Sequence, residues 1–270
     1  MKNFANKNKY PHFMTCEEYS KQLARNNLEN RCDIPMELVY HSADTVADHS
    51  YLKGLKKDCE FYDIKLSVVS HKNTVGNIVI NESFTEKPFL ISSSFDRYID
   101  IWNQMDVDQK KLHECDMDCY FGNMIYDMPC TAEGVLRYID TTGFNYKGQD
   151  ICIIGRGNVG YPLATNLITY FDCTVTVCNS HTMNVYEKLN NSDLAILAVD
   201  KINKFNWRGL RTPVLDVGIG IGLDGKLHGA VDEDTIDDCI DFCATGTRTF
   251  GLITREILIS RVIDFYRNYE

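Results

Sequence analysis

Six consecutive residues in the second half of the chain have the spacing of a phosphate-binding loop. Residues 155–160 read GRGNVG, the pattern G-x-G-x-x-G, and they lie between a β-favouring run and a helical pattern. In this pattern Gly155 permits a tight turn, Gly157 lets a pyrophosphate approach backbone N–H groups, and Gly160 lets the helix pack closely on the sheet. The helix N-terminus adds free N–H donors and a favourable dipole. We therefore predict a dinucleotide site; the alternative is a glycine-rich turn with no ligand.

The loop after the next expected strand bears on which dinucleotide binds. NAD enzymes often carry an Asp or Glu there to hold the ribose hydroxyls, but residues 178–182 read CNSHT. An acid would repel the phosphate of NADP, so its absence, together with Arg156 and Ser180, slightly favours NADP. Arg156 can equally be a solvated surface residue, so the prediction is NADP or NAD. The residues expected to bind the cofactor are Gly155, Arg156, Gly157, Asn158, Val159, Gly160, Asn179, Ser180 and Thr182.

The elements around these loops have the order of a doubly wound parallel sheet. Strands are expected over 150–154, 173–178, 194–199 and 213–217, with helices over 161–170 and 183–189 between them. This alternation is typical of a Rossmann-type domain. Residues 252–269 have helical apolar spacing without breakers, which predicts a long C-terminal helix.

The first half indicates a second, smaller α/β domain. Helices are expected over 16–27 and 50–62, and strands over 38–40, 64–69 and 88–92. The expected division is a substrate domain over 1–128, a dinucleotide-binding domain over 129–250, and a C-terminal helix over 251–270 that packs back on the first domain. Residues 130–146 form the expected connection of helix and turn.

Composition excludes several classes of function. The net charge of −10 disfavours binding to nucleic acid, and no apolar run is long enough to span a membrane. The polar N-terminus and the odd count of 11 cysteines predict reduced thiols and a cytoplasmic location. We expect no metal site, because neither the group His113, Cys115 and Cys119 nor the pair Cys239 and Cys243 has C-x-x-C spacing.

Five strings in the second half resemble the methylenetetrahydrofolate dehydrogenase/cyclohydrolase family. Residues 128–134 (MPCTAEG) are similar to P-C-T-P-x-G, and 153–162 (IIGRGNVGYP) to I-G-R-S-x-x-V-G-x-P, one residue shorter. Residues 174–182 resemble T-V-T-x-C-H-S-x-T, 215–219 contain D-V-G-I, and 224–232 resemble D-G-K-L-x-G-D-V-D. The resemblance implies a two-domain α/β fold, a homodimer, a folate-like substrate in a cleft between the domains, and oxidation of 5,10-methylenetetrahydrofolate to the 5,10-methenyl form.

The substrate side departs from the family. Tyr51 fits the family's helix motif Y-x-x-x-K, but its Lys position is Leu55, and the Gln of V-Q-L-P is missing from residues 91–94 (ISSS). The Asp of D-V-D-G is matched by Asp118, whereas 247–254 (TRTFGLIT) keeps only one glycine and the Thr of P-G-G-V-G-P-M-T.

Two residues match the substrate site of the family. The resemblance implies that Tyr51 packs on the aryl ring of the substrate and that Asp118 hydrogen-bonds the pterin-like ring of the substrate. Each has a plainer reading: Tyr51 as a core aromatic and Asp118 as a loop or cap residue. The neighbouring lysines of the helix, Lys53, Lys56 and Lys57, are read as a solvated face.

The missing residues affect the two reactions of the family differently. Hydride transfer is driven by the nitrogens that flank the methylene carbon and needs positioning and exclusion of water rather than an acid or base. Opening the methenyl ring needs attack by water and management of a proton, for which a tuned Lys is useful. We therefore predict a dehydrogenase that has lost the cyclohydrolase step. The alternatives are a related oxidoreductase acting on another amine or imine, and a non-catalytic dinucleotide-binding regulator.

Overall fold

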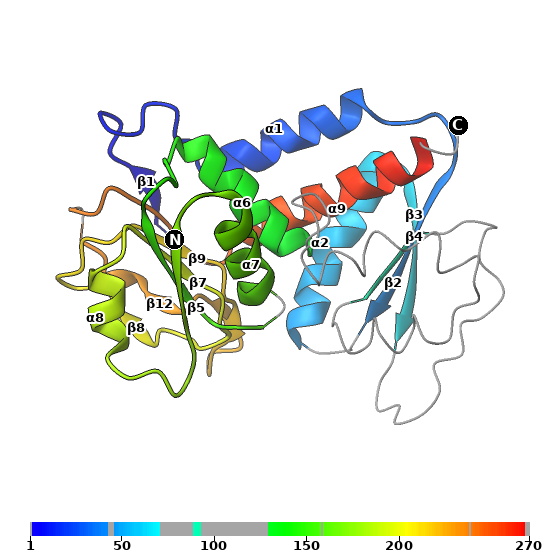
Figure 1. The fold of residues 1–270 in the computed structure, drawn as a ribbon. Coiled ribbons are helices and arrows are strands. Elements are labelled where there is room, and N and C mark those ends of the chain that lie inside the picture. Colours follow the sequence, from blue (N-terminus) through cyan, green and yellow to red (C-terminus); the bar gives the residue numbers. More distant parts are fainter. Residues whose placement is uncertain are drawn as a thin grey trace. The chain divides into compact units, whose positions relative to one another are not determined.

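The computed structural model describes residues 2–42, 46–70, 89–92, 129–157, 159–237 and 239–267. The chain divides into two compact units. Unit 1 contains residues 1–22 and 118–254, and unit 2 contains residues 23–117 and 255–270. Each unit is described by itself below, with the elements labelled as in Figure 1.

Unit 1 is built on a six-stranded sheet in the order β1-β13-β9-β7-β5-β6 (Figure 1). Its strands are β1 (Asn3–Ala5), β5 (Asp150–Ile154), β6 (Thr174–Cys178), β7 (Leu194–Leu197), β9 (Val214–Asp216) and β13 (Phe242–Ala244). All neighbouring pairs are parallel except β1 with β13. β6 and β7 lie on opposite sides of β5, so the direction of winding reverses between β5 and β7. The predicted doubly wound sheet is confirmed, and ligands of such sheets bind at this switch point, at the carboxyl ends of the strands.

The helices of unit 1 follow the expected alternation. They are α6 (Cys130–Thr142), α7 (Gly160–Tyr170) and α8 (Val185–Asn190), with the short 3₁₀ helix η2 (Glu233–Thr235). α6 ends at Gly143, which has the left-handed φ of 74° that glycine adopts without strain. The smaller strands pair as β8 (Phe205–Asn206) with β12 (Val231–Asp232), and as the hairpin of β10 (Gly220–Ile221) and β11 (Leu227–His228). One face of the sheet packs on a core that includes Ile154, Leu197, Trp207 and Val231.

The N-terminus of the chain belongs to unit 1, which the sequence pattern did not indicate. β1 pairs with β13 through Asn3 to Ala5, and this pairing places the first residues beside the sheet. The division therefore differs from the expected one, in which residues 1–128 form one domain. A strand of three residues has too little alternation to stand out in a sequence, and its position depends on an edge formed some 240 residues later.

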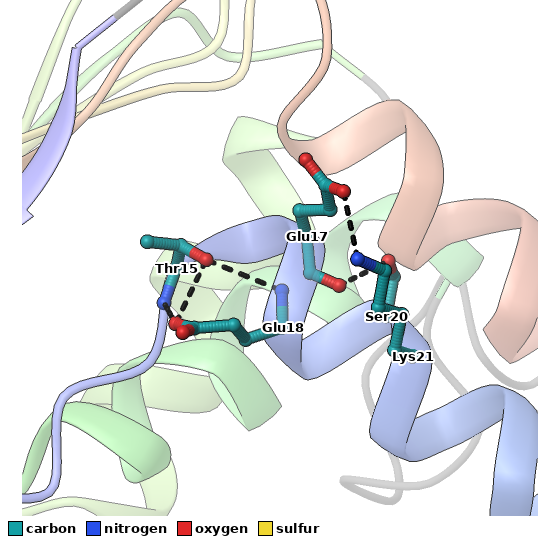
Figure 2. Close-up of polar contacts among 5 residues, drawn as sticks. All are labelled: Thr15, Glu17, Glu18, Ser20 and Lys21. Carbon is teal, nitrogen blue, oxygen red and sulfur yellow. Dashed lines mark hydrogen bonds and ion pairs between the residues drawn. The ribbon is translucent and has the colours of Figure 1, made fainter.

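Helix α1 (Cys16–Glu29) begins with a capping box, shown in Figure 2. The backbone N–H and the hydroxyl of Thr15 donate to Glu18 Oε2 at 2.8 and 2.9 Å, and the N–H of Glu18 donates to Thr15 Oγ1 at 3.2 Å. Lys21 donates to Glu17 Oε1 at 2.8 Å one turn along. The reciprocal bonds satisfy amides that would otherwise lack partners, so they fix the start of the helix at the predicted residue.

Unit 2 holds a three-stranded parallel sheet and the C-terminal helix. β2 (Met36–Ser42) pairs with both β3 (Ile64–Ser70) and β4 (Phe89–Ser92), and α2 (Val46–Tyr62) connects β2 with β3. α9 (Phe250–Arg267) begins in unit 1 and continues in unit 2.

The C-terminal helix is held on unit 2 by hydrogen bonds that are buried or partly buried. Tyr62 OH donates to Glu256 Oε2 at 2.7 Å, and Asn27 Nδ2 donates to Glu256 O at 2.9 Å. Tyr266 OH donates to Glu37 O at 3.1 Å. These contacts confirm that the C-terminal helix returns to elements of the first half. Within the described ranges, no helix combines the length and apolar character that crossing a membrane requires.

Candidate dinucleotide-binding site

The loop after β5 begins where three strands end. Gly155 has a φ of 112°, in the region that glycine favours, and its N–H donates to Cys178 O at the end of β6 at 2.8 Å. Ala198, directly after β7, donates its N–H to Ile154 O at 2.8 Å. A Cβ on Gly155 would lie 3.0 Å from the carbonyl carbon of Ala198 and closer still to its oxygen. The first glycine is therefore required by the fold, and it places the loop at the switch point of the sheet.

The loop ends where α7 packs against it. A Cβ on Gly160 would lie 2.8 Å from the carbonyl carbon of Gly155, closer still to its oxygen, and 3.3 Å from Ile153 Cγ2. The N-cap of α7 is Val159, whose side chain cannot cap the helix. The first turn of an uncapped helix presents N–H groups to a ligand, and the helix dipole favours an anion there.

Gly157 differs from the other two glycines because the fold does not require it. A Cβ at this position would meet nothing within 4 Å, and its φ lies outside the left-handed region. Both Gly157 and its neighbour Arg156 are exposed. The missing side chain leaves open space beside the start of α7, which is the room that a diphosphate needs to reach backbone amides. The loop thus fits a dinucleotide; the predicted residue Asn158 lies outside the described residues.

The loop after β6 is a turn formed by two of the predicted residues. The N–H of His181 donates to Asn179 Oδ1 at 2.8 Å, and the N–H of Asn179 donates to Thr182 Oγ1 at 2.9 Å. These two side chains shape the turn, while Ser180 and His181 are exposed on it. The loop brings no carboxylate to the carboxyl end of β6, so a phosphate there meets no acid from this turn.

A buried acid at the end of β9 was not among the predicted site residues. Asp216 is 2 % exposed, and the N–H of Val231 donates to its Oδ2 at 2.8 Å. Burial raises the pKa of this carboxyl to about 7, although the amides of Val231, Ala230 and Gly218 act in the opposite direction. The one signal in the sequence is an acid inside the apolar run PVLDVG.

The candidate substrate residues lie in unit 2 or outside the described residues. Tyr51 is half-buried on α2, and its ring stacks on Tyr40 with centroids 6.0 Å apart and planes at 29°. Leu55 is fully buried, whereas Lys53, Lys56 and Lys57 are exposed, as expected of a solvated face. Asp118, the group around His113, and Ser93 and Ser94 fall outside the described residues, so the roles given to Tyr51 and Asp118 stay predictions.

The buried cysteines Cys59 and Cys243 are poor candidates for chemistry. Cys243 is buried in β13 while Cys239 is exposed, and no group of three metal-ligating side chains occurs in the described ranges. Burial raises the pKa values of the Cys59 and Cys243 thiols to about 12. Such thiols stay protonated at neutral pH and are weak nucleophiles.

Comparison with known proteins agrees with this geometry. Residues 129–270, more than half of the chain, match the family model described as tetrahydrofolate dehydrogenase/cyclohydrolase, NAD(P)-binding domain. The matched residues include the loop 155–160 and the turn after β6. They form an NAD(P)-binding domain of this family.

Relatives extend the likeness over most of the chain. The bifunctional protein FolD of Brevibacillus brevis is 27% identical over 248 residues, which cover 85% of this chain and 86% of that protein. FolD of Thermotoga petrophila is 34% identical over 200 residues, or 68% of this chain and 71% of the relative. The crystal structure of the Trypanosoma brucei methylenetetrahydrofolate dehydrogenase-cyclohydrolase, complexed with NADP and an inhibitor, has the same fold, with a TM-score of 0.77, 17% identity and coverage of 95% and 97%. The chain therefore belongs to the tetrahydrofolate dehydrogenase/cyclohydrolase family.

Proposed function

We propose that this protein oxidises 5,10-methylenetetrahydrofolate to 5,10-methenyltetrahydrofolate with NADP or NAD and lacks the cyclohydrolase step. Two observations support the first half. The chain belongs to a family named for the dehydrogenase reaction, and its glycine loop has the open space at Gly157 that a dinucleotide fits. The second half rests on Leu55.

The dinucleotide site supplies binding and orientation. Backbone N–H groups at the start of α7 would hold the pyrophosphate, and we expect Arg156 and Ser180 to approach the ribose end of the cofactor. Because the turn after β6 carries no acid, the site slightly favours NADP, and both NADP and NAD stay in the proposal. When bound, the cofactor supplies nicotinamide C4, which accepts the hydride lost by the methylene carbon, so that carbon is left in the cationic methenyl form. Asp118 would hydrogen-bond the ring of the substrate, and Tyr51 would pack on its aryl group.

The observation that carries the loss of hydrolysis is the burial of Leu55. Its side chain has no exposed area and lies on the same helical face as Cys59 and Tyr62, which are 1 % exposed. This position is therefore part of an apolar core and provides no proton donor or acceptor. The exposed neighbours Lys56 and Lys57 lie about 100° and 200° further around the helix, so neither replaces it.

One experiment separates the two half-reactions. The whole protein is mixed with methylenetetrahydrofolate and NADP or NAD, and the reduced nicotinamide is followed at its absorbance maximum. Hydrolysis of added methenyltetrahydrofolate is followed separately. We expect oxidation with either cofactor and hydrolysis at the uncatalysed rate. Hydrolysis clearly above background would contradict the argument from Leu55, and tight binding of cofactor without oxidation would contradict the choice of substrate.

The first residue of α9 favours a second candidate. Where the family has a loop rich in proline and glycine, this chain places Phe250, which is 2 % exposed and packs edge-on against Tyr138 with centroids 5.4 Å apart. A segment that differs in this way from the loop of the family fits a different substrate, such as another amine or imine oxidised with the same cofactor. A regulator that binds dinucleotide without catalysis is the remaining alternative, and the same assay separates both from the first proposal.

The assembly and location of the protein are also proposed. The family resemblance supports a homodimer, which sedimentation equilibrium tests. Buried cysteines such as Cys16, Cys59 and Cys243 are free thiols, which supports work in a reducing compartment such as the cytoplasm.

A further inference from the structure

Asp216 occupies a distinctive place in unit 1. It is the last residue of β9 and pairs in register with Leu197 at the end of β7. Its Oδ2 accepts the N–H of Val231 at 2.8 Å, while Oδ1 is buried without a hydrogen-bond partner in the part of the chain that the structure describes. A Cβ on Gly229 would lie 3.1 Å from the Asp216 carboxyl carbon and closer still to Oδ2. The carboxyl is thus tightly enclosed at the carboxyl edge of the sheet.

Asp216 also lies at the base of the loop formed by residues 217–230. Residues 217–230 leave the sheet after β9, form the hairpin of β10 and β11, and return to Val231, which the carboxyl holds. At the start of this loop, the N–H of Gly218 donates to Leu197 O at 3.0 Å. A Cβ on Gly218 would lie 2.9 Å from the carbonyl carbon of Val199. The carboxyl is therefore enclosed by the loop that follows β9, and the start of that loop packs against the loop after β7.

The direction of the dinucleotide places its nicotinamide half on this side, an argument that rests on the proposed function. The loop after β5 holds the pyrophosphate, and the turn after β6 reads the ribose of the adenosine half. A dinucleotide that crosses the switch point then extends from β6 past β5 towards β7 and β9. Asp216 ends β9, the neighbour of β7 in the sheet, and the loop after β9 encloses its carboxyl.

We propose that Asp216 is a positioning residue that sets the preference of the site between oxidised and reduced cofactor. The oxidised nicotinamide ring carries a positive charge, and the reduced ring carries none. A carboxylate in a poorly solvated region attracts the first and not the second. By linkage, the oxidised cofactor also favours the ionised form of the carboxyl to the same extent.

The charge of this carboxyl changes in the physiological range. Burial raises its pKa to about 7, and the charged side chain that adds to this shift is Glu233 of η2. Glu233 accepts the hydroxyl of Thr245, which follows β13, while β7 presents the apolar Leu197. In the hairpin, Asp224 and His228 pair with each other, and Asp200 and Lys201 after β7 are exposed. As pH rises through about 7, Asp216 ionises and the oxidised cofactor gains affinity relative to the reduced one.

Equilibrium binding tests the proposal without catalysis. Dissociation constants of NADP⁺ and NADPH are measured on the whole protein from pH 5.5 to 8.5, by calorimetry and by nicotinamide fluorescence. Their ratio cancels the ionisation of the 2′-phosphate, because both forms of the cofactor carry the same phosphate. We expect Kd(NADPH)/Kd(NADP⁺) to rise about tenfold across this range in the native protein. It should stay flat in Asp216→Asn and still rise in the control Asp234→Asn, which removes the same charge from an exposed site.

The outcomes are separable. A flat ratio in the native protein that binds both cofactors tightly would overturn the inference and leave the proposed function standing, as would a rise that persists in Asp216→Asn. If neither cofactor binds, both the inference and the proposed function fail. If Asp216→Asn does not fold, the pH dependence of the native ratio decides alone.

Discussion

Alanine substitutions at Gly157 and Gly160 test which glycine of the loop 155–160 is needed for stability and which for cofactor binding. In Gly160→Ala the new Cβ would lie 2.8 Å from the carbonyl carbon of Gly155, a backbone atom that cannot rotate away. In Gly157→Ala the new methyl meets nothing within 4 Å. We expect Gly160→Ala to damage stability and Gly157→Ala to damage binding of the cofactor while leaving the protein stable.

The magnitudes follow from these contacts. Forcing a methyl into the packed junction at Gly160 costs about 1–3 kcal/mol of unfolding free energy. At Gly157 the φ permits alanine, and the reduced freedom of the unfolded chain adds about 0.4–1 kcal/mol of stability. If the methyl holds the pyrophosphate away from one backbone N–H, the lost hydrogen bond to a charged group is worth about 1.5–3 kcal/mol. That loss corresponds to cofactor binding about 10- to 100-fold weaker.

The assay measures both quantities on each variant. Urea unfolding followed by circular dichroism gives stability, and titration of NADPH fluorescence gives the dissociation constant. The reasoning is refuted if Gly157→Ala binds cofactor as tightly as the native protein, because the open space at residue 157 would then have no role in binding. It is equally refuted if Gly157→Ala loses stability while Gly160→Ala does not.

Three further changes test other parts of the structure. Leu55→Lys should lower the unfolding free energy measured by urea unfolding by about 3–5 kcal/mol, because its ammonium would be buried in an apolar core. The variant should not catalyse hydrolysis. Native-like stability would show that the lysine side chain reaches water. Tyr62→Phe removes the 2.7 Å bond to Glu256 and should lower the urea midpoint by the equivalent of about 1–3 kcal/mol, and an unchanged midpoint would mean that this bond does not hold α9. The pKa of Asp216 rises from 3.8 to about 7 on folding. The unfolding free energy of the native protein should therefore fall by up to about 4 kcal/mol relative to that of Asp216→Asn as pH rises from 4 to 7, with little change above pH 7. Parallel pH profiles of stability in the two proteins would contradict this sign.

Local patterns predicted the elements that carry the glycine loop. β5, α7 and β6 were each indicated by a short apolar run or helical spacing, bounded by glycine or polar residues, and α1 starts at the predicted residue because Thr15 and Glu18 cap it. These features depend on neighbours within a few residues, which a sequence displays directly.

Features that depend on distant partners could not be predicted in the same way. β1 is defined by its pairing with β13, and the strand order that places the switch point between β5 and β7 depends on crossovers between strands. At the site, Asn179 and Thr182 were expected to bind cofactor, but the structure shows their side chains shaping a turn, which leaves direct binding as a proposal. The burial of Asp216 follows from the return of Val231 to the end of β9, which no spacing in the sequence encodes.

The surroundings of Leu55 would make the proposed lack of hydrolysis difficult to reverse by one substitution. The adjacent Gly54 leaves room for Arg255 of α9, because a Cβ on Gly54 would lie 2.7 Å from the Arg255 guanidinium carbon. Arg255 Nε donates to Asp58 Oδ2 at 2.5 Å one turn further along α2. This surface of α2 therefore contacts the C-terminal helix, while the face with Leu55 packs in the core. A lysine at residue 55 would have to displace packed atoms before it could reach a substrate. Hydride transfer needs only two reactants held in place, so the proposed dehydrogenase step does not depend on a lysine at this position.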